Sequence, residues 1–224
     1  TEDVFRVDGV SGDNCYLLTR PGELVLLDSG LPGNAGRIVR FIRGLGRDPG
    51  ELSWIVLTHS DPDHSGSVVE LKQRTGAKVA IHAADAPSVV GEAPLKEGPG
   101  VRGVVFRALL GLLRFRTFRP DLLLQEGDTL AGLRVFHTPG HTRGSISLLA
   151  EHGVLFSGDA VVTLRDEPTF PSHFWSLDFD EGLRSMHKLA GLDFDVLAPG
   201  HGPPVVGDAA GKLRRLLDKA DRAA

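Results

Sequence analysis

The chain has 224 residues, of which 25 are basic and 29 acidic, so its formal net charge is −4. The acidic balance gives no sign of general affinity for nucleic acids. One cysteine excludes an internal disulfide bond. No apolar stretch is long enough to span a bilayer, so stable membrane insertion is not expected and the cytoplasm is the default location. The length suits one large domain, taken as residues 1–224, with a sizeable core.

The first part of the chain predicts an antiparallel sheet that passes into alternating strands and helices. Turns at 9–12 and 21–22 separate the opening strands. The helix at 36–45 is amphipathic, because its apolar residues recur on one face. The expected elements are strands at 4–7, 15–19, 24–28, 54–57 and 78–82 and helices at 36–45 and 65–75.

The second part repeats the alternation of strands and helices without repeating the sequence. Expected are strands at 134–137, 145–149, 154–157 and 196–198 and helices at 180–190 and 208–223. Strands and helices on this scale predict an α/β fold with two sheets flanked by helices. Loops that carry functional residues would gather along one edge of the sheets.

The most informative run is Thr-His-Ser-Asp-Pro-Asp-His at residues 58–64, directly after an apolar strand. It places His59, Asp61, Asp63 and His64 within six residues. Histidines and carboxylates together are ligands for zinc, iron or manganese rather than for calcium or magnesium. The alternative is a polar loop that caps the following helix. The run therefore indicates a metal site, which the rest of the chain can test.

Three further strand ends present a histidine or an aspartate. His141 follows Thr-Pro-Gly, Asp159 follows Ser-Gly, and His201 follows Pro-Gly, each after an apolar run. Glycine lets the backbone turn sharply, and proline fixes the turn. One such unit could be chance, but repeated units favour a shared metal centre.

The order of these motifs resembles the metallo-β-lactamase superfamily, and within it the glyoxalase II-like hydrolases. The motifs are His-x-Asp-x-Asp-His, then Pro-Gly-His-Thr, then Ser-Gly-Asp, then Pro-Gly-His-Gly. The match runs from about Asn14 to His201 and so covers nearly the whole chain. The resemblance implies a four-layer αββα sandwich with a binuclear metal site.

The resemblance also implies how two divalent cations would be held. One cation would be bound by His59, Asp61 and His141, the other by Asp63, His64 and His201, and Asp159 would bridge both. The common family pattern has a histidine where this chain has Asp61. A carboxylate there favours iron or manganese more than the usual site does, although zinc remains the first choice.

Three residues beside the ligands are candidates for orienting them. In the family, the aspartate at the position of Asp28 hydrogen-bonds a metal ligand or its loop, and such support tunes a ligating imidazole. The alternative for Asp28 is an ordinary turn aspartate. Thr58 and Thr142 adjoin ligand histidines and are comparable candidates. His137 lies inside a predicted strand and is interpreted as a structural histidine.

The predicted function is hydrolysis of a small-molecule ester, thioester or lactone by a metal-bound hydroxide. Two cations lower the pKa of a bridging water toward 7 and polarise the substrate carbonyl. Asp63 would steer the hydroxide and pass a proton to the leaving group. The Gly-x-Ser-x-Gly pattern of serine hydrolases is absent from the sequence, in agreement with this prediction.

Other functions are weighed against hydrolysis. His59, His141 and Asp159 alone form the set of two histidines and one carboxylate of non-haem iron oxygenases, so a thiol or persulfide dioxygenase is the main alternative. A nuclease is disfavoured by the acidic charge. A non-catalytic module braced by metals would have closed coordination at both ions.

Two variable segments are expected to shape the substrate pocket. The segment 91–125 contains an apolar, arginine-rich stretch at 101–118 that predicts an amphipathic helix, too short and too charged to cross a membrane. As a lid or pocket wall it would offer Phe106, Phe115 and Phe118 to the substrate. The alternatives are a helix packed on the domain, a homodimer contact, or attachment to a membrane surface.

The second variable segment, 167–178, contains the run His173, Phe174 and Trp175. An aromatic run of this kind beside a metal edge is a candidate substrate contact.

Overall fold

The computed structural model describes residues 3–95 and 115–222. The chain forms two compact units, Thr1–Leu124 and Gln125–Ala224, and each is described by itself. The single domain over residues 1–224 stays a prediction. Phe106 and most of the predicted helix at 101–118 lie outside the described residues, and its described end, residues 115–118, is corrected because it is not helical.

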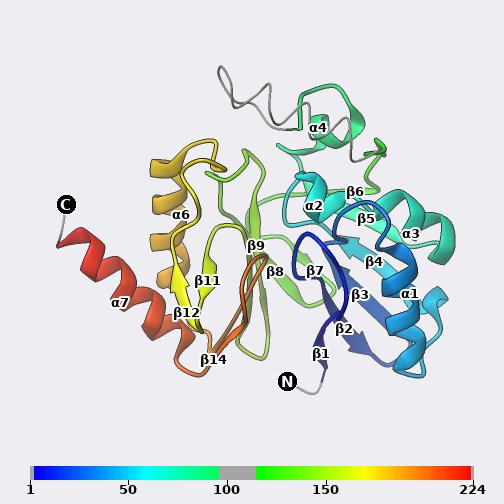
Figure 1. Ribbon diagram of the computed structural model, residues 1–224, viewed down its shortest axis with the longest axis horizontal. Helices are drawn as coiled ribbons and strands as arrows, with labels where there is room; N and C mark the ends of the chain where they lie inside the picture. Colours follow the sequence, from blue (N-terminus) through cyan, green and yellow to red (C-terminus); the bar gives the residue numbers. More distant parts are fainter. Residues whose placement is uncertain (1–2, 96–114, 223–224) are drawn as a thin grey trace. The chain divides into compact units, whose positions relative to one another are not determined.

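The first unit is built on a mixed sheet in the order β1-β2-β3-β4-β5-β6 (Figure 1). The first three strands pair antiparallel, and the remaining neighbours pair parallel. The strands are β1 (Val4–Arg6), β2 (Tyr16–Arg20), β3 (Glu23–Leu27), β4 (Leu52–Val56), β5 (Lys78–His82) and β6 (Leu122–Leu124). The antiparallel start of the sheet is thus confirmed.

The helices of the first unit are short. They are α1 (Ala35–Gly44), the 3₁₀ helix η1 (Pro49–Glu51), α2 (Pro62–Ser65), α3 (Val68–Thr75) and α4 (Ala86–Val90). The helix predicted at 65–75 is corrected, because the regular part begins only at Val68. Gly66 lies against Pro32, so closely that an added Cβ would be 2.4 Å from its ring. The Gly66 N–H donates to the Gly30 carbonyl at 2.9 Å, so it makes no helical hydrogen bond between α2 and α3.

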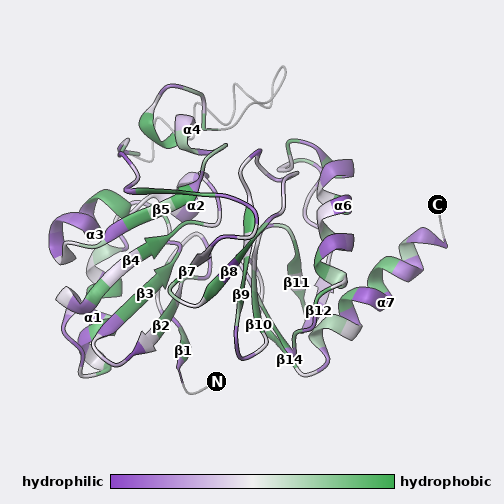
Figure 2. Ribbon diagram, turned by 180° about the vertical axis from the view of Figure 1, so that it is seen from behind, coloured by the Kyte–Doolittle hydropathy of each residue, from purple (hydrophilic) through white to green (hydrophobic). Residues whose placement is uncertain are grey.

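The core of the first unit lies between the sheet and its helices. Ile38 and Ile42 of α1 and Leu71 of α3 are buried together with alternate residues of the strands. Figure 1 shows α1 and α3 on the same face of this sheet, and Figure 2 shows how strongly hydrophobic residues dominate β3 and β5. Because these strands are buried in the core, their carboxyl ends are rigid and fix the positions of the loops that follow them.

The second unit is built on a sheet in the order β14-β13-β10-β9-β8-β7. The pair β10 and β13 is parallel, and the other neighbours are antiparallel. The strands are β7 (Thr129–Leu130), β8 (Leu133–His137), β9 (Ile146–Ala150), β10 (Val154–Gly158), β13 (Val196–Pro199) and β14 (Val205–Val206). A separate pair is formed by β11 (Val162–Leu164) and β12 (Glu167–Thr169).

Two longer helices, α6 (Phe179–Ala190) and α7 (Ala209–Asp221), pack on this second sheet. Met186 and Leu189 of α6 and Leu213 of α7 are buried in a core with Leu155 of β10. Asp178 caps α6, since its carboxylate accepts the backbone N–H of Glu181 at 2.9 Å. The α/β alternation predicted for this part of the chain is confirmed. Within residues 3–95 and 115–222, no helix has the length and apolarity that crossing a membrane requires.

Candidate metal centre

The first unit gathers four of the predicted ligands in the loop that follows β4. His59 and His64 are fully buried, Asp61 is nearly so, and Asp63 is partly exposed. The Nε2 atom of His59 lies 3.8 Å from Oδ2 of Asp61, and the Nε2 atom of His64 lies 4.0 Å from Oδ2 of Asp63. The two imidazole rings are 4.0 Å apart at their centroids. The loop therefore presents two histidine–aspartate pairs side by side.

These separations fit the donor spacing of a bound cation. Two ligand atoms that each lie about 2.1 Å from zinc are about 3.4 Å apart at the tetrahedral angle. The two pairs in the loop are a few tenths of an ångström wider than this. Small side-chain rotations would bring both atoms of a pair onto one ion. The donor set of imidazoles and carboxylates is that of zinc, iron or manganese.

Asp28, at the end of β3, orients both histidines through a chain of hydrogen bonds. Its Oδ2 atom lies 2.9 Å from Nδ1 of His64 and also accepts the Thr58 hydroxyl at 2.7 Å, while Oδ1 accepts the Thr58 N–H at 2.8 Å. Because the Thr58 hydroxyl donates to a carboxylate, its oxygen is the acceptor for Nδ1 of His59 at 3.0 Å. Both rings then carry a proton on Nδ1 and a lone pair on Nε2, the nitrogen that would face a metal.

Two further residues hold the backbone of this loop and were not predicted from the sequence. Asp85, buried before α4, accepts the Ser60 N–H at 2.8 Å. Ser65 donates its hydroxyl to the carbonyl oxygens of Ser60 and Asp61, both at 3.0 Å. The backbone on either side of the first aspartate is thus fixed by buried side chains.

Asp13 is a further buried carboxylate at this site, which was also not predicted from the sequence. Its Oδ2 atom lies 3.3 Å from Nδ1 of His64, and its Oδ1 atom accepts the Cys15 thiol at 3.3 Å. Burial raises the pKa of Asp13 to about 8, although the charge interaction with His64 by itself lowers that pKa. Burial also raises the pKa of the Cys15 thiol, with a further contribution from the Asp13 charge. Cys15 is accordingly a neutral, buried thiol.

The second unit brings together the other three predicted ligands. Asp159 follows β10, and its Oδ2 atom lies 3.5 Å from Nε2 of His141 and 3.3 Å from Nε2 of His201. His141 follows β8, and His201 follows β13. One carboxylate oxygen therefore stands between two imidazole nitrogens at the separation expected when a cation lies between each pair.

The turn that carries His141 is packed against the beginning of α6. An added Cβ on Gly140 would lie 2.3 Å from the backbone nitrogen of Gly182, and Gly140 has a φ of 134°. The Ser185 hydroxyl donates to the carbonyl of Pro139 at 2.7 Å. Only glycine fits this approach, so the Pro-Gly before His141 is a steric requirement of the helix contact.

The turn that carries His201 is held in a similar way by β11. The Thr163 N–H donates to the His201 carbonyl at 3.1 Å, and the Thr163 hydroxyl donates to the Pro203 carbonyl at 2.5 Å. An added Cβ on Gly202 would lie 2.1 Å from the Thr163 carbonyl oxygen. Thr163 was not predicted as a site residue, because β11 is too short to show a pattern in the sequence.

The remaining predicted residues lie in several places. Thr142 bonds Ser145, since the two hydroxyl oxygens are 2.8 Å apart. His137 lies 2.9 Å from the carbonyl of Arg143 through Nε2. Phe118 is buried in the core of the first unit, and Phe115 is partly buried against that core. Both aromatic side chains therefore pack on that core, and a substrate contact by either one stays a prediction.

The predicted aromatic run of the second unit lies before α6. Phe174 and Trp175 are 49% and 43% exposed, whereas the His173 ring stacks on Phe179 with centroids 3.3 Å apart. His173 is exposed as well, so all three side chains of the run reach solvent, and Phe174 and Trp175 supply its large apolar surface.

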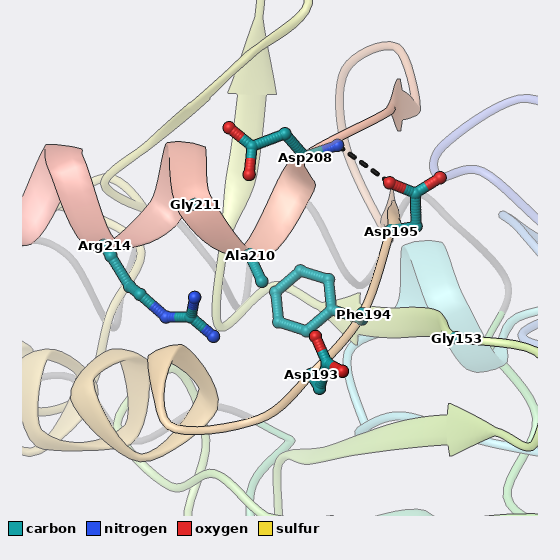
Figure 3. Close-up of a pocket in the computed structure, with 8 residues that line it drawn as sticks. All are labelled: Gly153, Asp193, Phe194, Asp195, Asp208, Ala210, Gly211 and Arg214. Carbon is teal, nitrogen blue, oxygen red and sulfur yellow. Dashed lines mark hydrogen bonds between the residues drawn. The ribbon is translucent and has the colours of Figure 1, made fainter.

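A pocket of about 270 Å³ lies in the second unit where α7 begins (Figure 3). The Asp195 carboxylate accepts the Asp208 N–H at 2.8 Å, and Arg214 donates to the carbonyls of Ala190 and Leu192 at 2.8 and 2.9 Å. None of the predicted ligands lines this pocket. Its polar groups attach α7 to the rest of the unit.

Known proteins resemble this chain in sequence. The sequence matches the Metallo-beta-lactamase superfamily over residues 8–201. It is 32% identical to the probable metallo-hydrolase YflN of Bacillus subtilis, over 87% of this chain and 82% of that protein. It is 31% identical to the uncharacterized protein YobT of the same organism, over 93% of this chain and 91% of that protein.

Two further relatives, each matched over less of its own length, have named activities. The hydroxyacylglutathione hydrolase of Acidiphilium cryptum is 26% identical over 87% of this chain and 65% of that protein. The acyl-coenzyme A thioesterase MBLAC2 of Gallus gallus is 39% identical over 47% of this chain and 40% of that protein.

Solved structures show the same fold. A metallo-beta-lactamase family protein of Thermus thermophilus, TTHA1429, has a TM-score of 0.74 at 26% identity and covers 99% of this chain and 80% of its own. TTHA1623, in a di-iron-bound form, has a TM-score of 0.72 at 25% identity and covers 95% and 96%. The predicted fold class, α/β of the αββα type, is therefore confirmed, and the chain belongs to the metallo-β-lactamase superfamily.

Proposed function

We propose that the chain is a metal-dependent hydrolase that binds two divalent cations. His59, Asp61 and His141 would hold one cation, Asp63, His64 and His201 the other, and Asp159 would bridge them. The observation that carries the proposal is the position of the Asp159 Oδ2 atom, 3.5 Å from one histidine and 3.3 Å from another. A single oxygen so placed suits a bridge between two ions.

The cations would supply the chemistry that the side chains lack. When bound, they lower the pKa of water toward 7 and polarise a substrate carbonyl, so that water attacks it at neutral pH. The side chains of the protein would orient the ligands, position the water and transfer the proton. Asp28 and Thr58 keep the lone pairs of His59 and His64 on Nε2. Asp63, whose side chain is 36% exposed, would steer the attacking water and carry a proton to the leaving group.

Zinc is the proposed metal, with iron and manganese as alternatives. Asp61 makes the first cation site harder and more anionic than a third histidine would. The relative TTHA1623 was solved with two irons, so the fold accommodates that metal in at least one related protein. Metal content of the purified protein decides among the three.

A thioester is the proposed substrate class, with esters and lactones as further carbonyl compounds of similar reactivity. Support comes from the two relatives with named activities, a hydroxyacylglutathione hydrolase and an acyl-coenzyme A thioesterase. We propose a small-molecule substrate with no nucleic-acid partner, in keeping with the net charge of −4. A cytoplasmic location and a homodimer are also proposals.

The test is turnover of a panel of glutathione and coenzyme A thioesters, esters and lactones. We expect His59→Ala and Asp159→Ala to lower kcat/KM by about 100-fold or more, because loss of an orienting partner alone costs 10- to 100-fold. His152→Ala, an exposed histidine at the turn after β9, is the matched control and should keep full activity. Undiminished turnover in Asp159→Ala would contradict the proposal.

The dioxygenase alternative requires its own measurement. If the purified protein contains iron and consumes oxygen with a thiol or persulfide substrate, the reaction is oxidation and not hydrolysis. We expect no oxygen consumption while the thioester panel is turned over.

A further inference from the structure

An aromatic segment, residues 172–177, leads from β12 toward α6 and exposes apolar side chains. Phe174, Trp175 and Leu177 are 49%, 43% and 37% exposed. No residue from 168 to 177 is charged. Large exposed apolar groups gathered in a short uncharged segment mark a contact surface more often than isolated ones do.

The aromatic segment is attached to the turn that carries the ligand His141. The Leu177 N–H donates to the His141 carbonyl at 3.2 Å, and the Asp178 N–H donates to the Gly140 carbonyl at 2.9 Å. Phe174 and Trp175 precede Leu177 by three and two residues. Since a chain extends at most about 3.5 Å per residue, their backbones lie within about 14 Å of that carbonyl. The backbone that carries the exposed rings therefore lies within one acyl-chain length of the ligand turn.

Internal hydrogen bonds give the aromatic segment a defined shape. The N–H groups of Trp175 and Ser176 donate to the Ser172 carbonyl at 3.1 and 3.0 Å, and the Ser176 hydroxyl donates to the same oxygen at 2.9 Å. The Phe174 and Trp175 rings meet edge to face, with centroids 4.8 Å apart. His173 is held against Phe179. A surface fixed in this way binds an apolar group without first having to order itself.

We propose that Phe174 and Trp175 bind the acyl chain of the substrate and make the enzyme selective for longer acyl groups. This inference rests on the proposed hydrolysis of thioesters. The exposed surface consists of two rings and one leucine, and the leucine is hydrogen-bonded to the ligand turn through its backbone. An alkyl chain carries no polar atoms, so it can cover an uncharged aromatic surface without losing hydrogen bonds to water. Each methylene that leaves water against the rings should raise kcat/KM about twofold to fourfold.

The first experiment measures kcat/KM for coenzyme A thioesters with straight acyl chains from acetyl to decanoyl. In the wild type, kcat/KM should rise with chain length. In Phe174→Ala and Trp175→Ala, it should fall at least tenfold for decanoyl and less than twofold for acetyl. Phe174→Leu should retain most of the chain-length dependence, because leucine keeps an apolar surface.

Val206→Ala is the matched control, since Val206 is 74% exposed on β14 of the same unit. It should leave the whole series unchanged. Equal loss at all chain lengths in Phe174→Ala and Trp175→Ala, or a flat series in the wild type, would overturn the inference while leaving hydrolysis itself intact.

The second experiment does not depend on turnover. The chain has two tryptophans, so in Trp54→Phe protein the fluorescence comes from Trp175 alone. Titration with non-hydrolysable thioether analogues should shift this emission to the blue, more strongly for decyl than for ethyl. No shift at any length would overturn the inference. A shift in a protein that hydrolyses no thioester would support the acyl-binding surface and refute the proposed function.

Discussion

The two units hold their ligands by different means. In the first, four ligands come from one loop, and buried side chains orient them: Asp28 and Thr58 fix the histidine rings, and Asp85 fixes the backbone. In the second, three ligands come from three strand ends, and backbone packing of glycines against α6 and β11 holds the turns.

This difference predicts different responses to mutation. Where hydrogen bonds orient a ring, an altered side chain should change metal affinity and activity while the fold survives. Where backbone packing places a turn, an added methyl group should affect the fold first. Substitutions at the two kinds of position should therefore separate a loss of fold stability from a loss of metal affinity.

Gly140→Ala should strongly destabilise the protein. Its Cβ would lie 2.3 Å from the backbone of Gly182 at a φ of 134°, so overpacking and backbone strain together should lower the free energy of unfolding by about 3 kcal/mol or more. The reciprocal change, Gly182→Ala, puts its Cβ 3.8 Å from the Gly140 Cα, an ordinary contact, and should stabilise α6 by about 0.5–1 kcal/mol. Urea unfolding measures both, and equal effects would refute the packing account.

Asp28→Asn should act on the ligands rather than the fold. An amide placed among the Thr58 hydroxyl and the His64 Nδ1–H offers a donor where an acceptor is needed. We expect metal affinity and kcat/KM to fall by about 10- to 100-fold. Asp85→Asn, which keeps an acceptor for the Ser60 N–H, should cost less than tenfold. A larger loss from Asp85→Asn would reverse the assigned roles.

Asp13 should make the metal-free protein less stable at higher pH. Its pKa is raised in the folded protein from 3.8 to about 8, so folding favours the protonated form. The stabilisation is complete below about pH 4 and is lost as the pH rises through 8, with a slope of at most about 1.4 kcal/mol per pH unit.

Urea unfolding of chelator-treated wild type and Asp13→Asn between pH 5 and 8 measures this contribution. The advantage of the asparagine variant should grow as the pH rises. A difference that does not change with pH would exclude Asp13 as the titrating group.

Asp61→His should shift the choice of metal. A third imidazole in place of a carboxylate softens the first cation site, so the zinc-to-iron ratio of protein produced with equal supplies of both should rise severalfold. Metal analysis of the two proteins tests this. An unchanged ratio would show that the other ligands, or the supply of metal, determine which ion is bound.

The sequence could predict each strand end that carries a ligand, because an apolar run is followed closely by a histidine or an aspartate, with a glycine directly before it at His141, Asp159 and His201. The strand predicted at 78–82 has the same bounds as β5, and the predicted alternation of strands and helices along the chain is confirmed. The αββα fold was predicted from the ordered motifs and is confirmed by the solved relatives.

The supporting residues could not be predicted, because their partners are distant in sequence. Asp13 contacts His64, Asp85 contacts Ser60, and Thr163 contacts His201, and no local pattern signals such pairs. Strands of two or three residues such as β11 and β14 are also too short to show an alternation of apolar and polar residues.

The number of cations per chain tests the central claim most directly. Native mass spectrometry of wild type and Asp159→Ala, each loaded with zinc and freed of excess metal, should show two cations in the wild type. Because Asp159 would bridge both sites, the variant should retain one or none. A wild type that binds no zinc, or a variant that keeps two zinc ions, would contradict the account.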